Sequence, residues 1–313
     1  MSYDLVIQNG QIVTPEGIFG GSIAIEEGRI AELSERSLTG LETLDAGGQL
    51  ILPGVVDLHV HFSEPGRAHW EGWAHGSRAA AAGGVTTVVE MPLNAIPATT
   101  NVTALEAKLA AAQHQSVVDY ALWGGLVDNN LADLEALAQT GVIGFKAFMV
   151  DIKDESFRFV EGQVLREGMH RIARAGHFLA VHAEDNGQAW QRTLDMQEVG
   201  RLDRRAWGQA RSPEVELEAI RTALGLAQQT NCPLHVVHVS IPEGVDALNT
   251  ARRQGQKVTL ETCAHYLTLS DDDLVQQGPE CKCAPPLRDK VRQEALWDQV
   301  LAGEIDCITS DHS

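Results

Sequence analysis

From residue 55 onward, short apolar runs rich in β-branched residues alternate with longer stretches in which apolar residues recur every three or four positions. The short runs predict eight strands, at Val55–His61, Val85–Met91, Val118–Val127, Val142–Met149, Phe178–His182, Leu234–Val239, Val258–Thr262 and Cys307–Ser310. The longer stretches predict helices at Ala104–Gln113, Leu131–Thr140, Gln163–Ala175, Val215–Gln229 and Glu243–Gln254. Apolar strands separated by helices are typical of a parallel sheet covered on both faces. The pattern therefore indicates an α/β fold, and eight strands in succession favour a (β/α)₈ TIM barrel over an open sheet.

Residues 1–52 have a different texture, with short alternating runs separated by turn residues. The first run, Asp4–Gly10, ends in Asn9-Gly10, a pair that is a strong hairpin signal. We therefore expect a small β module over residues 1–52, followed by the barrel over residues 53–313.

Charge narrows the range of partners. The chain carries 24 basic and 43 acidic residues, a formal net charge of -19. Nucleic acids and anionic membranes bind basic surfaces, so neither is expected as a partner. The N-terminus lacks the basic start and apolar core of a signal peptide, and no apolar run approaches the length of a membrane span. The five cysteines, an odd number, are expected to be free thiols in a reducing cytoplasm.

Polar residues with metal-binding chemistry stand at the C-terminal ends of the predicted strands. Catalytic groups of a TIM barrel lie at that end of the strands. Two residues apart on a strand, side chains point to the same face, so His59 and His61 can reach one ion. The full set of candidates is His59, His61, Lys146, His182, His238 and Asp311. Isolated histidines on apolar strands are more often satisfied core residues, but five strand ends sharing this chemistry favour a metal site.

At these residues the sequence resembles the amidohydrolase superfamily, in its cyclic-amidase branch of allantoinases, hydantoinases and dihydroorotases. The resemblance extends over essentially the whole chain. The segments that carry it are Pro53–His61, Gly144–Lys146, Val181–Glu184, His235–Ser240, Cys283–Arg288 and Ser310–Ser313.

Within that branch the chain is most similar to the allantoinase group, in the loop Ser63–Gly72 and in Glu90–Asn94. Dihydroorotases carry a carboxylate-binding arginine where Ser63 stands here. Hydantoinases carry a tyrosine at the position of Asp151. Both departures disfavour those two activities, which remain as alternatives. An alternative of another class is a non-catalytic scaffold protein, although such relatives typically lose ligands.

The resemblance implies two divalent metal ions, with zinc as the first choice and cobalt, manganese, iron or nickel as alternatives. His59, His61 and Asp311 would bind the first ion, and His182 and His238 the second. Lys146, carboxylated by carbon dioxide, would bridge both. An ammonium group cannot bind a metal, but burial lowers the pKa of a lysine and exposes a neutral amine. Without the resemblance, a buried lysine paired with a carboxylate is the more ordinary expectation.

The implied reaction is the hydrolysis of the cyclic amide bond of allantoin to allantoate, a step of purine and ureide catabolism. A hydroxide bridging the metals would attack a ring carbonyl, and Asp311 would pass its proton to the leaving nitrogen. Glu90, Glu184 and Glu261 are candidate partners for the second nitrogen of the ligand histidines. The candidate substrate contacts are Ser63, Asn94, Cys283 and Ala284, where ordinary loop roles are the alternative.

Members of this branch continue well beyond the position of Ser313. The resemblance therefore implies a chain truncated at its C-terminus, with a front module that forms only the N-terminal part of a β-sandwich. It also implies a homotetramer for the full-length enzyme.

Overall fold

The computed structural model describes residues 2–313. It divides into two compact units, one ending at Val55 and the other spanning Val56–Ser313.

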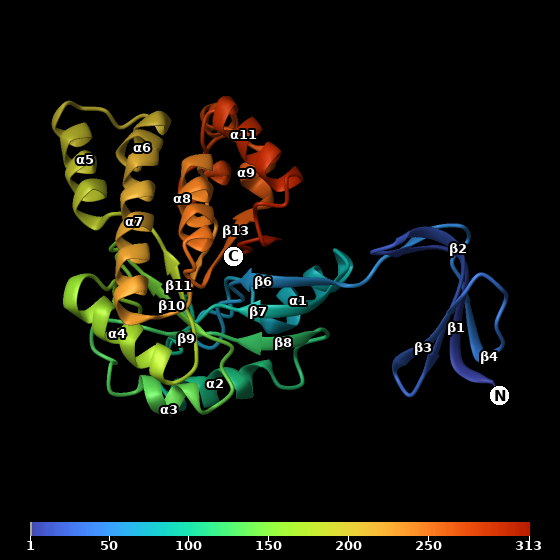
Figure 1. Ribbon diagram of the computed structural model, residues 1–313. Coiled ribbons are helices and arrows are strands. Elements are labelled where there is room, and N and C mark those ends of the chain that lie inside the picture. The colour runs from blue at the N-terminus through green and yellow to red at the C-terminus, as the bar shows by residue number, and fades with distance from the viewer. Residues whose placement is uncertain (1) are drawn as a thin grey trace. The chain divides into compact units, whose positions relative to one another are not determined.

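The first unit is a sheet of five strands (Figure 1). Strands β3, β2, β1 and β4 lie in that order, with β5 paired to β1. The strands are β1 Tyr3–Thr14, β2 Gly17–Glu26, β3 Arg29–Ser34, β4 Gly40–Asp45 and β5 Leu50–Ile51. Its buried apolar side chains include Val6, Ile12 and Ile23.

The prediction of a hairpin turn at Asn9-Gly10 is wrong. These residues lie inside β1, where the register with β2 shifts between Ile7 and Gly10, and the β1–β2 turn follows Thr14 instead. Asn9 has a φ of 57°. Asn-Gly favours positive φ, and a β-bulge uses that conformation as readily as a hairpin turn does. The signal therefore identified the backbone conformation but not the element that uses it.

The second unit contains nine parallel strands in two sheets. The smaller sheet has the order β6-β7-β8 and the larger has the order β14-β13-β12-β11-β10-β9. The strands are β6 Val55–Val60, β7 Val85–Glu90, β8 Asp119–Leu122, β9 Gly124–Gly125, β10 Phe145–Phe148, β11 Leu179–His182, β12 Leu234–Val236, β13 Val258–Cys263 and β14 Cys307–Thr309. Each predicted strand overlaps one of these, except that Val118–Val127 is divided at Trp123 into β8 and β9.

The two sheets are linked at both ends. Only Trp123 separates β8 in one sheet from β9 in the other. At the opposite end, Val60 of β6 forms a parallel bridge with His312, just after β14. The backbone N–H of His61 donates to the carbonyl oxygen of His312 at 2.7 Å. The ends of the first and last strands of this unit are thereby held side by side.

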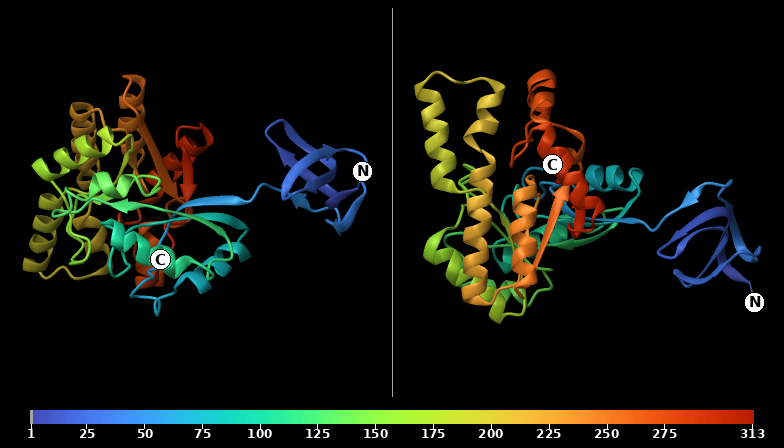
Figure 2. Two further views of the ribbon diagram at one scale, coloured as in Figure 1. Left: turned by 90° about the horizontal axis from the view of Figure 1, so that it is seen from below. Right: turned by 45° about the horizontal axis from the view of Figure 1, so that its top comes forward.

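Helices connect and cover the strands (Figures 1 and 2). They are α1 Trp73–Ala82, α2 Val102–Ala112, α3 Leu134–Ala138, α4 Gly162–Arg174, α5 Asn186–Glu198, α6 Arg204–Ala210, α7 Pro213–Thr230, α8 Pro242–Arg253, α9 Ala264–Thr268, α10 Asp271–Gln277 and α11 Lys290–Leu301, with a 3₁₀ turn at Pro279–Cys281. The five predicted helices correspond to α2, α3, α4, α7 and α8. In α4, Leu165, Met169 and Ile172 are buried, as the i, i+4, i+7 spacing of an amphipathic helix requires. None of the described helices is long and apolar enough to cross a membrane.

Candidate metal centre and substrate cavity

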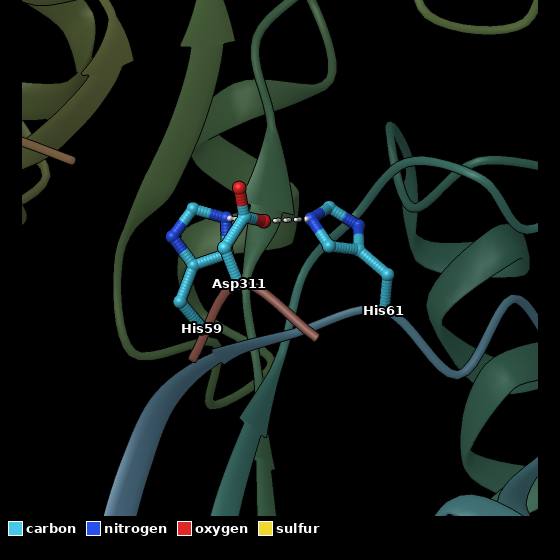
Figure 3. Close-up of side chains that lie close together, drawn as sticks. All are labelled: His59, His61 and Asp311. Atoms are coloured by element: carbon cyan, nitrogen blue, oxygen red, sulfur yellow. Dashed lines mark ion pairs between the residues drawn. The ribbon is translucent and has the colours of Figure 1, made fainter. Parts of the chain in front are cut away.

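Three of the predicted metal ligands meet where β6 and β14 end. His59 lies on β6, His61 follows it, and Asp311 follows β14. The Oδ1 atom of Asp311 lies 3.1 Å from Nε2 of His59 and 3.2 Å from Nε2 of His61 (Figure 3). One potential ligand atom from each residue lies within 4.8 Å of the others. The bridge between Val60 and His312 fixes this arrangement, because it joins the two backbones that carry the side chains.

His182 and His238 form a second group beside the first. His182 ends β11 and His238 follows β12, and both are buried. Nδ1 of His182 lies 3.0 Å from Nε2 of His238. The ring centroids of His59 and His238 are 5.5 Å apart, so the two groups are neighbours. Two imidazole nitrogens that face each other closely suit a shared cation, since zinc binds such nitrogens at about 2.0–2.1 Å.

Two of the three candidate glutamates contact these histidines. Oε2 of Glu184 lies 2.6 Å from Nε2 of His182, and Oε1 of Glu261 lies 2.5 Å from Nδ1 of His59. Each carboxylate engages one ring nitrogen and leaves the other for a metal, as outer carboxylates do in metal sites. Glu90 does not take this role. It is paired with Lys108 of α2 instead, and both side chains are fully buried.

Lys146 is buried on β10 and has no carboxylate partner among residues 2–313. Its Nζ makes no hydrogen bond within residues 2–313. Burial lowers the pKa of Lys146 to about 8. Lys108 shows the ordinary alternative, because its ammonium group meets Glu90 and the carbonyl oxygen of Met91. Lys146 is therefore not the ion-paired buried lysine that residue statistics favour.

The protonation of three of the four histidines fits cation binding, because these three are neutral. Burial lowers the pKa of His61 to about 4 and holds the pKa values of His182 and His238 well below the usual range. Burial also opposes protonation of His59, yet Asp311 and Glu261 together raise its pKa to about 9. Three neutral imidazoles and the Asp311 carboxylate form a donor set that suits divalent metals.

Several site residues have positive φ angles, which residues other than glycine rarely adopt. The φ angles are 63° at Ser63, 66° at Asn94, 39° at His238 and 49° at Asp311. Each such conformation costs about 1–3 kcal/mol and persists only where the surroundings enforce it, commonly at active sites. The strand ends therefore hold these residues in place against a local cost.

A cavity of about 560 Å³ opens over the two histidine groups. His61, His182 and Asp311 lie on its wall with three of the predicted substrate contacts, Asn94, Cys283 and Ala284. Ser63, the fourth, is not on that wall. It is 2% exposed, and its Oγ donates to the carbonyl oxygen of His61 at 3.4 Å. The prediction of a direct contact rested on Ser63 lying in a rim loop, but this loop turns inward behind the histidine.

The cavity wall also contains residues that the sequence did not single out. Trp207 of α6 and Arg211, just after it, lie on the wall. Nε1 of Trp207 donates to the carbonyl oxygen of Cys283 at 3.0 Å, which fixes the loop carrying Cys283 and Ala284. The short polar segment around α6 has no apolar periodicity that would have indicated its position.

Comparison with known proteins identifies the family. Residues 48–244 match a family model described as dihydro-orotase-like. The chain is 44% identical over 310 residues to an allantoinase of Solibacter usitatus, covering 99% of this chain and 68% of the relative. It is 40% identical over 317 residues to an allantoinase of Escherichia coli, covering 100% and 70%.

Solved structures of hydantoinases are similar to this chain over nearly its whole length. An L-hydantoinase (dihydropyrimidinase) from Arthrobacter aurescens superposes with a TM-score of 0.94 at 34% identity, covering 99% of this chain and 69% of that structure. A D-hydantoinase gives a TM-score of 0.88 at 28% identity, covering 99% and 68%. The chain belongs to the dihydro-orotase-like family, among relatives named allantoinase.

Proposed function

We propose that this protein is a metal-dependent hydrolase that opens the cyclic amide ring of allantoin to give allantoate. The relatives named allantoinase, at 40–44% identity over the full chain, support the substrate. The observation that carries the mechanism is the buried, unpaired Nζ of Lys146, which lies 5.1 Å from the centroid of the Phe148 ring that stacks on His182.

Two divalent metals, zinc as the first choice, would be held by these side chains. His59, His61 and Asp311 would bind one ion, and His182 and His238 the other. Carbon dioxide captured by the deprotonated amine of Lys146, with release of a proton, would give a carbamate that would supply anionic oxygen ligands. The metals would supply Lewis acidity towards the ring carbonyl and the attacking water. Imidazole and carboxylate groups are common zinc ligands, which supports this assignment.

Side chains of the site would carry out the proton transfer and orient the histidines. Burial acts to raise the pKa of Asp311, but His59 and His61 hold it well below its usual range, so Asp311 is ionised. From the cavity wall it can take a proton from the attacking water and pass it to the leaving ring nitrogen. Glu184 and Glu261 orient His182 and His59 through their outer ring nitrogens.

The parallel strands are proposed to close into a (β/α)₈ barrel in which β8 and β9 together count as one strand. The short Trp123 connection and the Val60–His312 bridge, at opposite ends of the two sheets, support closure. Closure would bring the C-terminal strand ends, and thus all six proposed ligands, to one rim.

The test combines metal analysis of the purified chain with hydrolysis assays on allantoin, hydantoin, dihydrouracil and dihydroorotate. Bound metal and opening of allantoin are expected. A chain that takes up no metal would exclude the mechanism. Ring opening of hydantoin or dihydrouracil without allantoin would favour the second candidate, a hydantoinase or dihydropyrimidinase, which the superposition on the Arthrobacter aurescens structure supports.

A further inference from the structure

Arg211 is a fixed and incompletely paired cation on the cavity wall. Its side chain is only 7% exposed. Nη1 donates to Oε2 of Glu184 at 2.5 Å, and its backbone carbonyl accepts from Nη1 of the buried Arg288 at 2.6 Å. Both ends of the residue are therefore anchored, so little conformational entropy would be lost when it binds a ligand.

The remaining donors of Arg211 have no protein partner. Nε is buried without an acceptor, and Nη2 makes no hydrogen bond within the described part of the chain. Buried polar groups are nearly always satisfied, so the buried Nε without an acceptor indicates a partner from outside the chain, either water or a ligand. Because Arg211 shares the cavity wall with His61, His182 and Asp311, a ligand at the proposed metal centre is a suitable source.

An aromatic ring and a second cation complete this part of the wall. Cζ of Arg211 lies 4.5 Å from the centroid of the Trp207 ring, and Nζ of the exposed Lys282 lies 4.3 Å from it. Such stacking holds a guanidinium plane in place. The wall therefore presents hydrogen-bond donors and positive charge, which suit carbonyl oxygens and disfavour an alkyl group.

We propose that Arg211, held by Glu184 and Trp207, binds the ring substituent of the substrate and selects cyclic ureides whose substituent carries a neutral carbonyl group. This inference rests on the proposed function, and it assigns the ureido group of allantoin to Arg211. A neutral acceptor fits better than a carboxylate, because Glu184 already balances the charge of Arg211. A substrate without a substituent would leave the Arg211 donors to water, whereas an alkyl group would displace that water without replacing its hydrogen bonds.

The test compares kcat/KM for allantoin and for unsubstituted hydantoin in Arg211→Lys. Lysine keeps a cation beside Glu184 but loses the planar fork and the stacking on Trp207. We expect kcat/KM for allantoin to fall on the order of 10-fold to 100-fold, the value of a hydrogen bond to a charged group, with a much smaller change for hydantoin. Arg201→Lys, at an exposed arginine paired with Asp203, is the matched control and should change neither.

Equal losses on both substrates would overturn the inference, because Arg211 would then act only through Glu184 and His182. An Arg211→Lys variant with the wild-type ratio of kcat/KM for allantoin to kcat/KM for hydantoin would overturn it as well. Efficient opening of dihydroorotate by the wild-type chain would also overturn it. If the wild-type chain opens none of these rings, the proposed function fails, and calorimetric titration with allantoin separates the two ideas. Binding weakened by Arg211→Lys but not by Arg201→Lys supports the inference, and binding equal in both variants overturns it. Metal content and melting temperature show whether each variant is folded.

Discussion

Two buried lysines of this chain have different surroundings, and the surroundings determine the role proposed for each. Lys108 and Lys146 are both fully buried. Lys108 meets the carboxylate of Glu90, whereas Lys146 has no hydrogen-bond partner among residues 2–313 and lies near histidines. Its position at a predicted strand end made Lys146 a candidate, but its role as a bridging ligand was indicated only by the family resemblance, because burial and pairing cannot be read from one chain. For the same reason, the sequence could not show that Glu90 pairs with Lys108 and not with a histidine.

The Lys146→Ala variant should lose both metal and activity, because no other side chain would supply the proposed bridging carbamate. A short carboxylic acid such as propionate should restore part of the activity by entering the vacated space. Metal content by elemental analysis and allantoin turnover with and without propionate are the measurements. Wild-type turnover in this variant would exclude the carbamate role.

The Lys108→Met variant should be destabilised by about 3–5 kcal/mol, because it leaves the buried Glu90 carboxylate without its counter-charge. The double variant Glu90→Gln/Lys108→Met should recover much of that loss, since no buried charge remains. Denaturant unfolding of both variants and the wild type measures the difference. A Lys108→Met variant as stable as the wild type would show that Glu90 is protonated and needs no partner.

At the scale of elements, apolar periodicity located those helices that bury one face and missed those that do not. The predicted helices α4 and α7 bury regular apolar stripes. In α5 the only buried residue is Ala189, so the segment offers no stripe to read. Trp123 interrupts the predicted strand Val118–Val127, and only the pairing of β8 and β9 with different neighbours shows the break. The segment with Trp207 and Arg211 lies where the sequence pattern is weakest.

Two helical glycines should respond in opposite ways to alanine. A Cβ at Gly168 of α4 would lie 2.5 Å from Cδ2 of Leu126, so Gly168→Ala should cost about 1–3 kcal/mol through overpacking. A Cβ at Gly225 of α7 would meet nothing within 4 Å, so Gly225→Ala should stabilise the protein by about 0.5–1 kcal/mol. Thermal or denaturant unfolding of the two variants checks both signs. Equal shifts would contradict the packing of α4 against Leu126.

At the scale of the whole molecule, the sequence correctly predicted the α/β class and the positions of the strands along the second unit. Both follow from eight apolar runs that are separated by clear helical patterns. The convergence of His59, His61 and Asp311 was also anticipated, since strand ends of a parallel sheet share one side. The inward turn of Ser63 was not, because a rim loop has no periodicity that fixes its direction.

Removal of metal should lower the melting temperature of the second unit, because the proposed ligands come from or directly follow five strands, β6, β10, β11, β12 and β14. A ligand present at 1,000 times its dissociation constant stabilises the folded state by about 4 kcal/mol. Scanning calorimetry before and after chelation, and again after zinc is returned, measures the shift. The Asp311→Asn variant should show a much smaller shift, and a wild-type shift in that variant would contradict its role as a ligand.

The contact between the ends of β6 and β14 also sets an order of events during synthesis. His59 touches Ser310, which lies 251 positions later in the chain. A ribosome makes proteins at about 5–20 residues per second, so the first histidines are exposed for many seconds before Asp311 emerges. Throughout that interval the growing chain holds the proposed ligands without a completed centre. The proposed metal loading would therefore be a late event in the life of each new molecule, after synthesis has reached Asp311.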